Sequence, residues 1–316
     1  MPPPLDLGPQ TQLLRQPQCF FFSALLRASY WPNVPGGDEL FAAAGPYTYY
    51  QSTLSDPNVP NWFGLDYGSW QVLAFAGTSN VTQWSNNVLG VGQSVKPPWP
   101  GRINNYFGNA ATTQLGNVLT VMGAHSPLNN VVCLGHSLGG GIANLVGYAL
   151  NVLHPGSVKW VCTEGGVRVG DLAWALGPTW PILAFRNSGD IIPYVPPNRG
   201  SLPSWVLNTV QWGPCQDYFP VGDEWVLTPS GGFHPQRVNY LAQPDAALLN
   251  QLYTQGLNPN ALSHSVGQYA QRILFWAGGL EGLYQGSPFG INQAAVYNWQ
   301  ATFGATDGFV WKAQFN

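Results

Sequence analysis

Charged side chains are scarce in this sequence, because Asp, Glu, Lys and Arg make up only 8% of its 316 residues. Globular proteins usually carry about three times that share. The formal net charge of -3 offers no basic surface of the kind that binds nucleic acid or anionic membranes. No apolar run reaches the length of about 20 residues that a membrane-spanning helix needs. We therefore expect no nucleic-acid partner and no transmembrane segment.

Cysteine is also rare, with four residues in the chain: Cys19, Cys133, Cys162 and Cys215. None belongs to a Cys-x-x-Cys pair or to a Cys/His spacing typical of zinc sites, so we expect no metal and no cofactor. Two of them, Cys133 and Cys162, lie in apolar runs and are expected to be buried as small hydrophobic side chains. The sequence leaves open whether Cys19 and Cys215 pair.

One short stretch carries the most information about function: Gly135-His136-Ser137-Leu138-Gly139-Gly140. An apolar run at 131–134 predicts a buried strand before it, and apolar side chains at helical spacing in 142–150 predict a helix after it. A strand, a sharp Gly-x-Ser-x-Gly turn and a helix together lift one serine out of a sheet. The sequence therefore predicts an exposed Ser137 hydroxyl at a helix N-terminus, where a developing negative charge is stabilised.

The competing interpretation of this stretch is a glycine-rich turn whose serine only caps the following helix. The nucleophile interpretation makes a further structural prediction. Because the turn is so tight, no residue larger than glycine should fit two positions before or after Ser137.

Strands and helices alternate along the middle of the chain. Apolar patterns predict strands at 71–76, 131–134, 159–163 and 182–186, and helices at 112–122 and 142–150. Such alternation predicts an α/β fold with a mostly parallel central sheet and helices on both faces. Residues 80–107 are expected to be irregular. Without an internal repeat or a linker, we expect a single domain over 1–316, with N-terminal (1–60) and C-terminal (277–316) extensions packed on it.

A serine nucleophile needs a base, and the base needs an orienting acid. Of the five histidines, His125 and His136 precede the serine and His154 ends the helix after it. His234 and His264 remain as candidates. We favour His264, because an apolar helix predicted directly after it can hold the imidazole in place. His234 lies in a glycine-rich stretch that predicts a turn, and it stays the alternative.

Asp190 is the best-placed acid, because it follows the strand predicted at 182–186. Its neighbours are apolar and proline-rich, so a carboxylate there needs a partner. The alternative is an Asx turn that only closes the strand. Asp171, Asp217 and Asp223 lie in polar or glycine-rich loops and have weaker claims. Two backbone N–H groups could bind the oxyanion: that of Leu138 and that of Thr78, which follows the 71–76 strand.

Several segments, in order between about Trp70 and Trp276, resemble the class 3 lipase family, which includes the filamentous-fungal triacylglycerol lipases. They are FAGTSNVTQW, GHSLGG, CTEGGVRVGD, FRNSGDIIPYVPP, DEWVL and LSHSVGQY. The chain departs from the family pattern in four places. Ala76 replaces an arginine, Val167 a proline, Asp171 an asparagine, and Ser263 an acid.

The resemblance implies an α/β-hydrolase fold and a serine hydrolase that cleaves carboxylic esters of lipids through an acyl-enzyme. Ser137, His264 and Asp190 would form the catalytic triad, and Thr78 and Leu138 the oxyanion hole. The family also implies a movable lid at residues 80–107, with apolar candidates to face lipid at Trp84, Val88, Leu89, Val91 and Trp99. The first ten residues lack the features of a signal peptide, yet the resemblance and the low charge favour a secreted protein.

Triad chemistry alone does not fix the substrate. The leading interpretation is a lipase or carboxylesterase that acts on lipid or another apolar ester at an oil–water interface. A phospholipase A1 and a feruloyl-type polysaccharide esterase would use the same residues. A non-catalytic relative that binds lipid or carbohydrate is the alternative from a different class, and the intact Ser, His and Asp argue against it.

Overall fold

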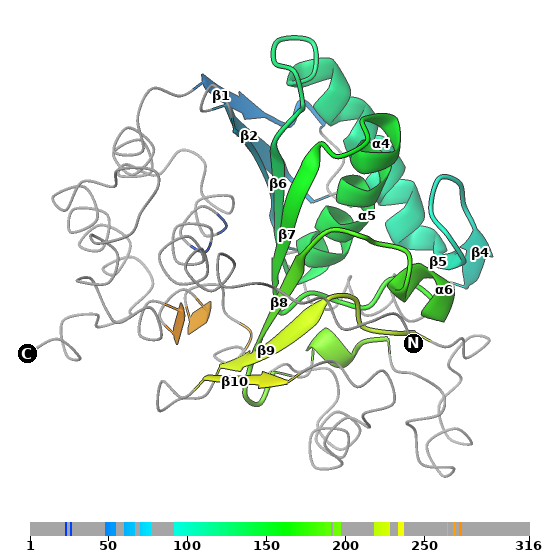
Figure 1. Ribbon diagram of the computed structural model, residues 1–316, viewed down its shortest axis with the longest axis vertical. Helices are drawn as coiled ribbons and strands as arrows, with labels where there is room; N and C mark the ends of the chain where they lie inside the picture. The colour runs from blue at the N-terminus through cyan, green and yellow to red at the C-terminus, as the bar shows by residue number, and fades with distance from the viewer. Residues whose placement is uncertain are drawn as a thin grey trace, which may run out of the picture.

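A computed structural model describes the central part of the chain. The described residues are 23, 26, 48–54, 60–66, 70–77, 92–190, 192–196, 218–227, 233–236, 264, 268–269 and 272–273. They contain a sheet of eight strands in the order β1-β2-β3-β6-β7-β8-β9-β10 (Figure 1). The strands are β1 Thr48–Gln51, β2 Trp62–Asp66, β3 Gln71–Phe75, β6 Val131–His136, β7 Val158–Glu164, β8 Ile182–Asn187, β9 Asp223–Leu227 and β10 Phe233–Gln236.

The centre of this sheet is parallel, as the sequence predicts. Strands β3, β6, β7, β8 and β9 pair in parallel, whereas β1, β2 and β10 add antiparallel pairs at the two edges. The four strands predicted from apolar runs are β3, β6, β7 and β8. Because parallel strands carry their carboxyl ends at one edge, the residues that follow β6 and β8 lie near one another.

Helical residues lie on both sides of the sheet. Helix α4 (Asn105–Val121) and helix α5 (Leu138–Leu153) lie on one face (Figure 1). The described helical residues near the two ends of the chain lie on the other side of the sheet in the same view. Among them Leu26, Tyr269 and Ile273 are completely buried. These two segments, remote in sequence, therefore contribute to the core of the fold.

Helix α4 begins earlier than the apolar pattern predicts, at Asn105 rather than at residue 112. The side chain of Asn104 accepts hydrogen bonds from the backbone N–H groups of Tyr106 and Phe107, and so caps the helix. A hairpin of β4 (Gln93–Val95) and β5 (Arg102–Asn104) precedes this cap. The expectation that 80–107 is irregular is therefore wrong for β4 and β5. Each of these strands has three residues, which is too short to show an alternation of apolar and polar side chains.

Helix α5 packs closely on the sheet because of its small residues. A Cβ added at Gly140 would contact the Cα of Gly166, and one added at Gly147 would lie 3.0 Å from a methyl group of Val161. Short helical segments complete the described fold, α6 (Leu172–Ala175) and the 3-10 turn η1 (Ile192–Tyr194). No helix in these described ranges combines the length and the apolar character that crossing a membrane requires.

The expectation for two cysteines is confirmed: Cys133 and Cys162 are buried in the core. Cys19 and Cys215 lie outside the described residues, and so do nearly all of the 1–47 segment and all of 277–316. The single-domain organisation with two packed extensions stays a prediction.

Candidate active site

Ser137 lies in a turn that only a few residue types tolerate. It separates β6 from α5 with φ 57° and ψ -123°, and it is the one non-glycine residue with positive φ within the described residues. Its N–H donates to the carbonyl of Glu164 at 2.9 Å, and its carbonyl accepts from the N–H of Gly140 at 3.0 Å. These bonds hold the strained backbone in place.

The two glycines of the motif are required by the space around them. A Cβ at Gly135 would collide with the backbone of Gly139, and a Cβ at Gly139 would collide with the carbonyls of Phe75 and Ala76. The predicted need for glycine on both sides of Ser137 is therefore confirmed. The hydroxyl of Ser137 makes no capping hydrogen bond to the helix, so the interpretation as a simple helix cap is wrong.

The imidazole of His264 lies within hydrogen-bonding distance of both Ser137 and Asp190. Nε2 of His264 is 2.8 Å from Oγ of Ser137, and Nδ1 of His264 is 2.8 Å from Oδ2 of Asp190. A carboxylate can only accept, so Nδ1 donates to Asp190 and Nε2 is left to accept the proton of the serine hydroxyl. Ser137 is only 6% exposed, so the prediction of an exposed side chain is wrong.

The carboxyl group of Asp190 is buried and has three donors. Its Oδ1 accepts from the backbone N–H of Ile192 at 2.9 Å, which is the Asx turn considered as an alternative. Its Oδ2 accepts from His264 and also from the hydroxyl of Tyr269, at 2.5 Å. The turn and the contact with His264 therefore coexist, one on each carboxyl oxygen.

Tyr269 is part of the site although the sequence indicated it only as a helix residue. Its hydroxyl accepts from the backbone N–H of Asn187 at 3.0 Å, so its own proton is directed at Asp190. Burial, and then the charge of Asp190, raise the pKa of Tyr269 well above its usual value of 10.0. Tyr269 thus remains a hydrogen-bond donor.

His136 is the second site residue that sequence reasoning missed. Its Nε2 lies 2.8 Å from the backbone carbonyl oxygen of His264, and the two imidazole rings are 4.8 Å apart. Burial, followed by the neighbouring His264, lowers the pKa of His136 well below 6.5. The only signal in the sequence was its place next to the serine, which by itself argued against a role as the base.

Glu164 lies opposite His136 on the adjacent strand and is completely buried. Within the described part of the chain, neither of its carboxyl oxygens has a hydrogen-bond partner. Burial raises the pKa of Glu164 to about 8, and the nearby hydroxyl of Ser23, which does not reach hydrogen-bond geometry, offsets only part of this shift. The carboxyl group beside the elbow is therefore mostly protonated at neutral pH.

Only one of the two expected oxyanion donors is described. Leu138 is the first residue of α5 and lies directly after Ser137, so its N–H is at the helix N-terminus. Thr78 lies outside the described residues, which end on this side at Gly77. The two-donor oxyanion hole stays a prediction.

The remaining candidate histidines and acids have other positions. His234 is in strand β10, paired with Val226, and not in the predicted turn. Asp171 caps α6 by accepting from the N–H of Trp174, and it pairs with Arg102. Asp217 lies outside the described residues, and Asp223 begins β9.

Trp99 does not face lipid as the lid interpretation expected. It is 4% exposed, and its Nε1–H donates to the carbonyl of Leu145 at 2.8 Å. An indole whose N–H finds a partner in the core is stable there. The other lid candidates, Trp84, Val88, Leu89 and Val91, lie outside the described residues.

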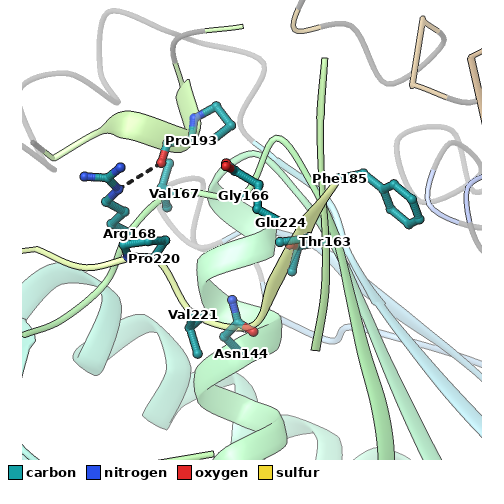
Figure 2. Close-up of a pocket in the computed structure, with 11 residues that line it drawn as sticks. Asn144, Thr163, Gly166, Val167, Arg168, Phe185, Pro193, Pro220, Val221 and Glu224 are labelled. Atoms are coloured by element: carbon teal, nitrogen blue, oxygen red, sulfur yellow. Dashed lines mark hydrogen bonds between the residues drawn. The ribbon is translucent and has the colours of Figure 1, made fainter. Parts of the chain in front are cut away.

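A small cavity of about 30 Å³ lies beside the elbow helix (Figure 2). Asn144, Thr163, Gly166 and Glu224 are among its lining residues, and Nε of Arg168 donates to the carbonyl of Pro193 at its rim. Neither Ser137 nor His264 lines it, so this cavity is not a substrate site. The described residues contain no group of three or more His, Cys, Asp or Glu side chains that could hold a metal ion.

Comparison with known proteins gives a family match over part of the chain. The model of the class 3 lipase family matches residues 72–200, which include Ser137 and Asp190 but not His264. No curated protein matches the chain.

Three solved structures that resemble this chain are lipases. The Rhizomucor miehei lipase propeptide complex is 19% identical with a TM-score of 0.52, over 87% of this chain and 80% of that one. Lipase II from Rhizopus niveus is 19% identical with a TM-score of 0.54, over 81% and 94%. A triacylglycerol lipase whose catalytic centre is described as a serine protease triad is 20% identical with a TM-score of 0.53, over 80% and 91%. At these identities the likeness establishes the α/β-hydrolase fold.

Proposed function

We propose that this carboxylic ester hydrolase, which carries a class 3 lipase region at residues 72–200, cleaves lipid esters with a Ser137–His264–Asp190 triad. The observation that carries the proposal is the continuous chain of hydrogen bonds from the serine hydroxyl through the imidazole to the buried carboxylate. The triad named for the triacylglycerol lipase of the same fold supports it by analogy.

The first half of the reaction acylates Ser137. Nε2 of His264 takes the hydroxyl proton while Oγ attacks the carbonyl carbon of the ester, and Asp190 stabilises the imidazolium that forms. The N–H groups of Leu138 and Thr78 would bind the oxyanion of the tetrahedral intermediate. When the intermediate collapses, the C–O bond to the alcohol breaks and the departing oxygen takes the proton from His264.

The second half releases the acid. Water loses a proton to His264 and attacks the acyl carbon, and the bond to Oγ then breaks as the proton returns to the serine oxygen. The products are a carboxylic acid, the alcohol and the free enzyme. No step requires a cofactor or a metal.

Acylglycerols presented at an oil–water interface are the proposed substrates, because the lipases of the same fold suggest them. A panel of a short-chain ester, an emulsified long-chain triacylglycerol, a phospholipid and a feruloyl ester tests this choice. Fastest turnover of the triacylglycerol supports it. Preference for the phospholipid or the feruloyl ester would instead identify a phospholipase A1 or a polysaccharide esterase.

The residue roles are tested separately from the substrate. Ser137→Ala should lose nearly all hydrolysis of a chromogenic ester while it keeps the circular dichroism spectrum of the native protein. His264→Ala should be inactive and His234→Ala active. Equal activity of Ser137→Ala and the native protein would refute the triad.

A further inference from the structure

We infer that His136 is a positioning residue that holds the backbone of His264 against the elbow. The inference rests on the proposed function, because it gives His136 a task only if His264 is the base. His136 is the last residue of β6 and directly precedes the nucleophile. His136 is therefore positioned by the end of the same strand that positions Ser137.

The direction of the hydrogen bond between the two histidines is fixed by chemistry. A backbone carbonyl oxygen only accepts, so His136 carries a proton on Nε2 and donates it to the carbonyl of His264 across 2.8 Å. The bond joins residues 128 positions apart in sequence. The two bonds of the His264 ring fix its side chain, and this third bond fixes its main chain.

The packing around His136 leaves its ring little freedom. The residue is 5% exposed, and its ring lies 4.8 Å from that of His264 and 5.8 Å from that of Tyr269, edge to face in the second case. A base held at both its ring and its main chain keeps Nε2 aligned with the serine hydroxyl. Alignment matters because displacing a reacting group by about 1 Å can cost about a hundredfold in rate.

His136 also has to remain uncharged for this role. His264 becomes an imidazolium each time it takes a proton, and a second cation at a ring distance of 4.8 Å would oppose that step. Burial keeps His136 neutral, as the lowered pKa indicates. The donor is thus compatible with the charge that develops on its partner.

Two substitutions separate the hydrogen bond from the packing. His136→Phe keeps a flat ring against His264 and Tyr269 but removes the donor. His136→Gln places an amide N–H at about the reach of Nε2 and restores the donor. His125→Phe is the matched control, since His125 is exposed and stacks on Tyr50 away from the triad.

Steady-state kinetics with a soluble chromogenic ester provide the test. We expect His136→Phe to lower kcat on the order of tenfold with KM changed by less than about twofold, which is the pattern for an interaction that matters in the transition state. His136→Gln should recover most of the loss, and His125→Phe should match the native protein. If His136→Phe does not fold, His136→Asn replaces it in the test. The side chain of Asn is one methylene shorter than that of Gln, so its amide N–H does not reach the carbonyl of His264.

The outcomes distinguish this inference from the proposed function. Native kcat in folded His136→Phe, or equal kcat in His136→Gln and His136→Asn, would overturn the positioning role while Ser137→Ala and His264→Ala remain inactive. Activity retained in Ser137→Ala and His264→Ala would overturn the triad itself.

Discussion

The hydroxyl of Tyr269 donates a hydrogen bond to Oδ2 of Asp190 across 2.5 Å, although 79 residues separate them in sequence. The same carboxyl oxygen accepts from Nδ1 of His264. Asp190 is only 1% exposed, so these donors replace the water molecules that a carboxylate would otherwise bind. The helical segment that follows His264 therefore also stabilises Asp190, through the hydroxyl of Tyr269.

Replacing Tyr269 by Phe should lower kcat on the order of tenfold with little change in KM, because a hydrogen bond to a charged group contributes roughly 1.5–3 kcal/mol. Tyr218→Phe is the matched control. Its buried hydroxyl accepts from Nδ2 of Asn104 at 3.0 Å, away from the triad, so its loss should lower the melting temperature and leave kcat unchanged. If both variants lost kcat equally, Tyr269 would have no special relation to Asp190.

Ser137 is held in a backbone conformation that glycine adopts more readily than any other residue. Ser137→Gly and Ser137→Ala should both be inactive, since both lack the hydroxyl. Ser137→Gly should nevertheless melt at a higher temperature than Ser137→Ala, because relief of strain of about 1–3 kcal/mol exceeds the extra entropy of the unfolded glycine chain. A higher melting temperature for Ser137→Ala would show that the turn is not strained.

The glycine at position 139 should not tolerate a methyl group. In Gly139→Ala the new Cβ would meet the carbonyls of Phe75 and Ala76, which are backbone atoms and cannot rotate away. We expect no soluble folded protein, or a loss of several kcal/mol in the free energy of unfolding. Gly116→Ala is the control, because a Cβ at this position would point into open space. It lies inside helix α4 and should stabilise the fold by about 0.5–1 kcal/mol.

The sequence predicted the parts of this site that depend on local pattern. Apolar runs located β3, β6, β7 and β8, and the Gly-x-Ser-x-Gly turn indicated Ser137 because its geometry is encoded within five neighbouring residues. Asp190 was indicated by its place after a strand. Each of these signals is short in range.

The contributions of Tyr269 and His136 depend instead on contacts between segments remote in the chain. Nothing in the neighbours of Tyr269 shows that its hydroxyl meets Asp190, since only the folded sheet and helix bring them together. Trp99 was misassigned for the same reason, because a tryptophan in a loop shows no period that would reveal its bond to Leu145.

Glu164 should make the free energy of unfolding depend on pH, and the substitution Glu164→Gln should remove this dependence. Its pKa is about 8 in the folded protein and about 4.5 when unfolded, so its contribution to stability is fully present below about pH 4.5. Between pH 4.5 and 8 the unfolded chain loses the proton that the folded protein keeps. Stability then falls by as much as about 1.4 kcal/mol per pH unit, and the loss is complete above pH 8.

The free energy of unfolding of Glu164→Gln, relative to the native protein, should therefore rise between pH 5 and pH 8 by a few kcal/mol and stay constant near pH 4. Denaturant titrations at a series of pH values measure this difference, and the value at pH 4 serves as the reference for the cost of the buried amide itself. The same difference at every pH would mean that the carboxyl of Glu164 ionises freely in the fold. Because Glu164 lies opposite His136 beside the elbow, its ionisation above pH 8 would also place a charge next to the triad, and the native protein should lose activity there before Glu164→Gln does.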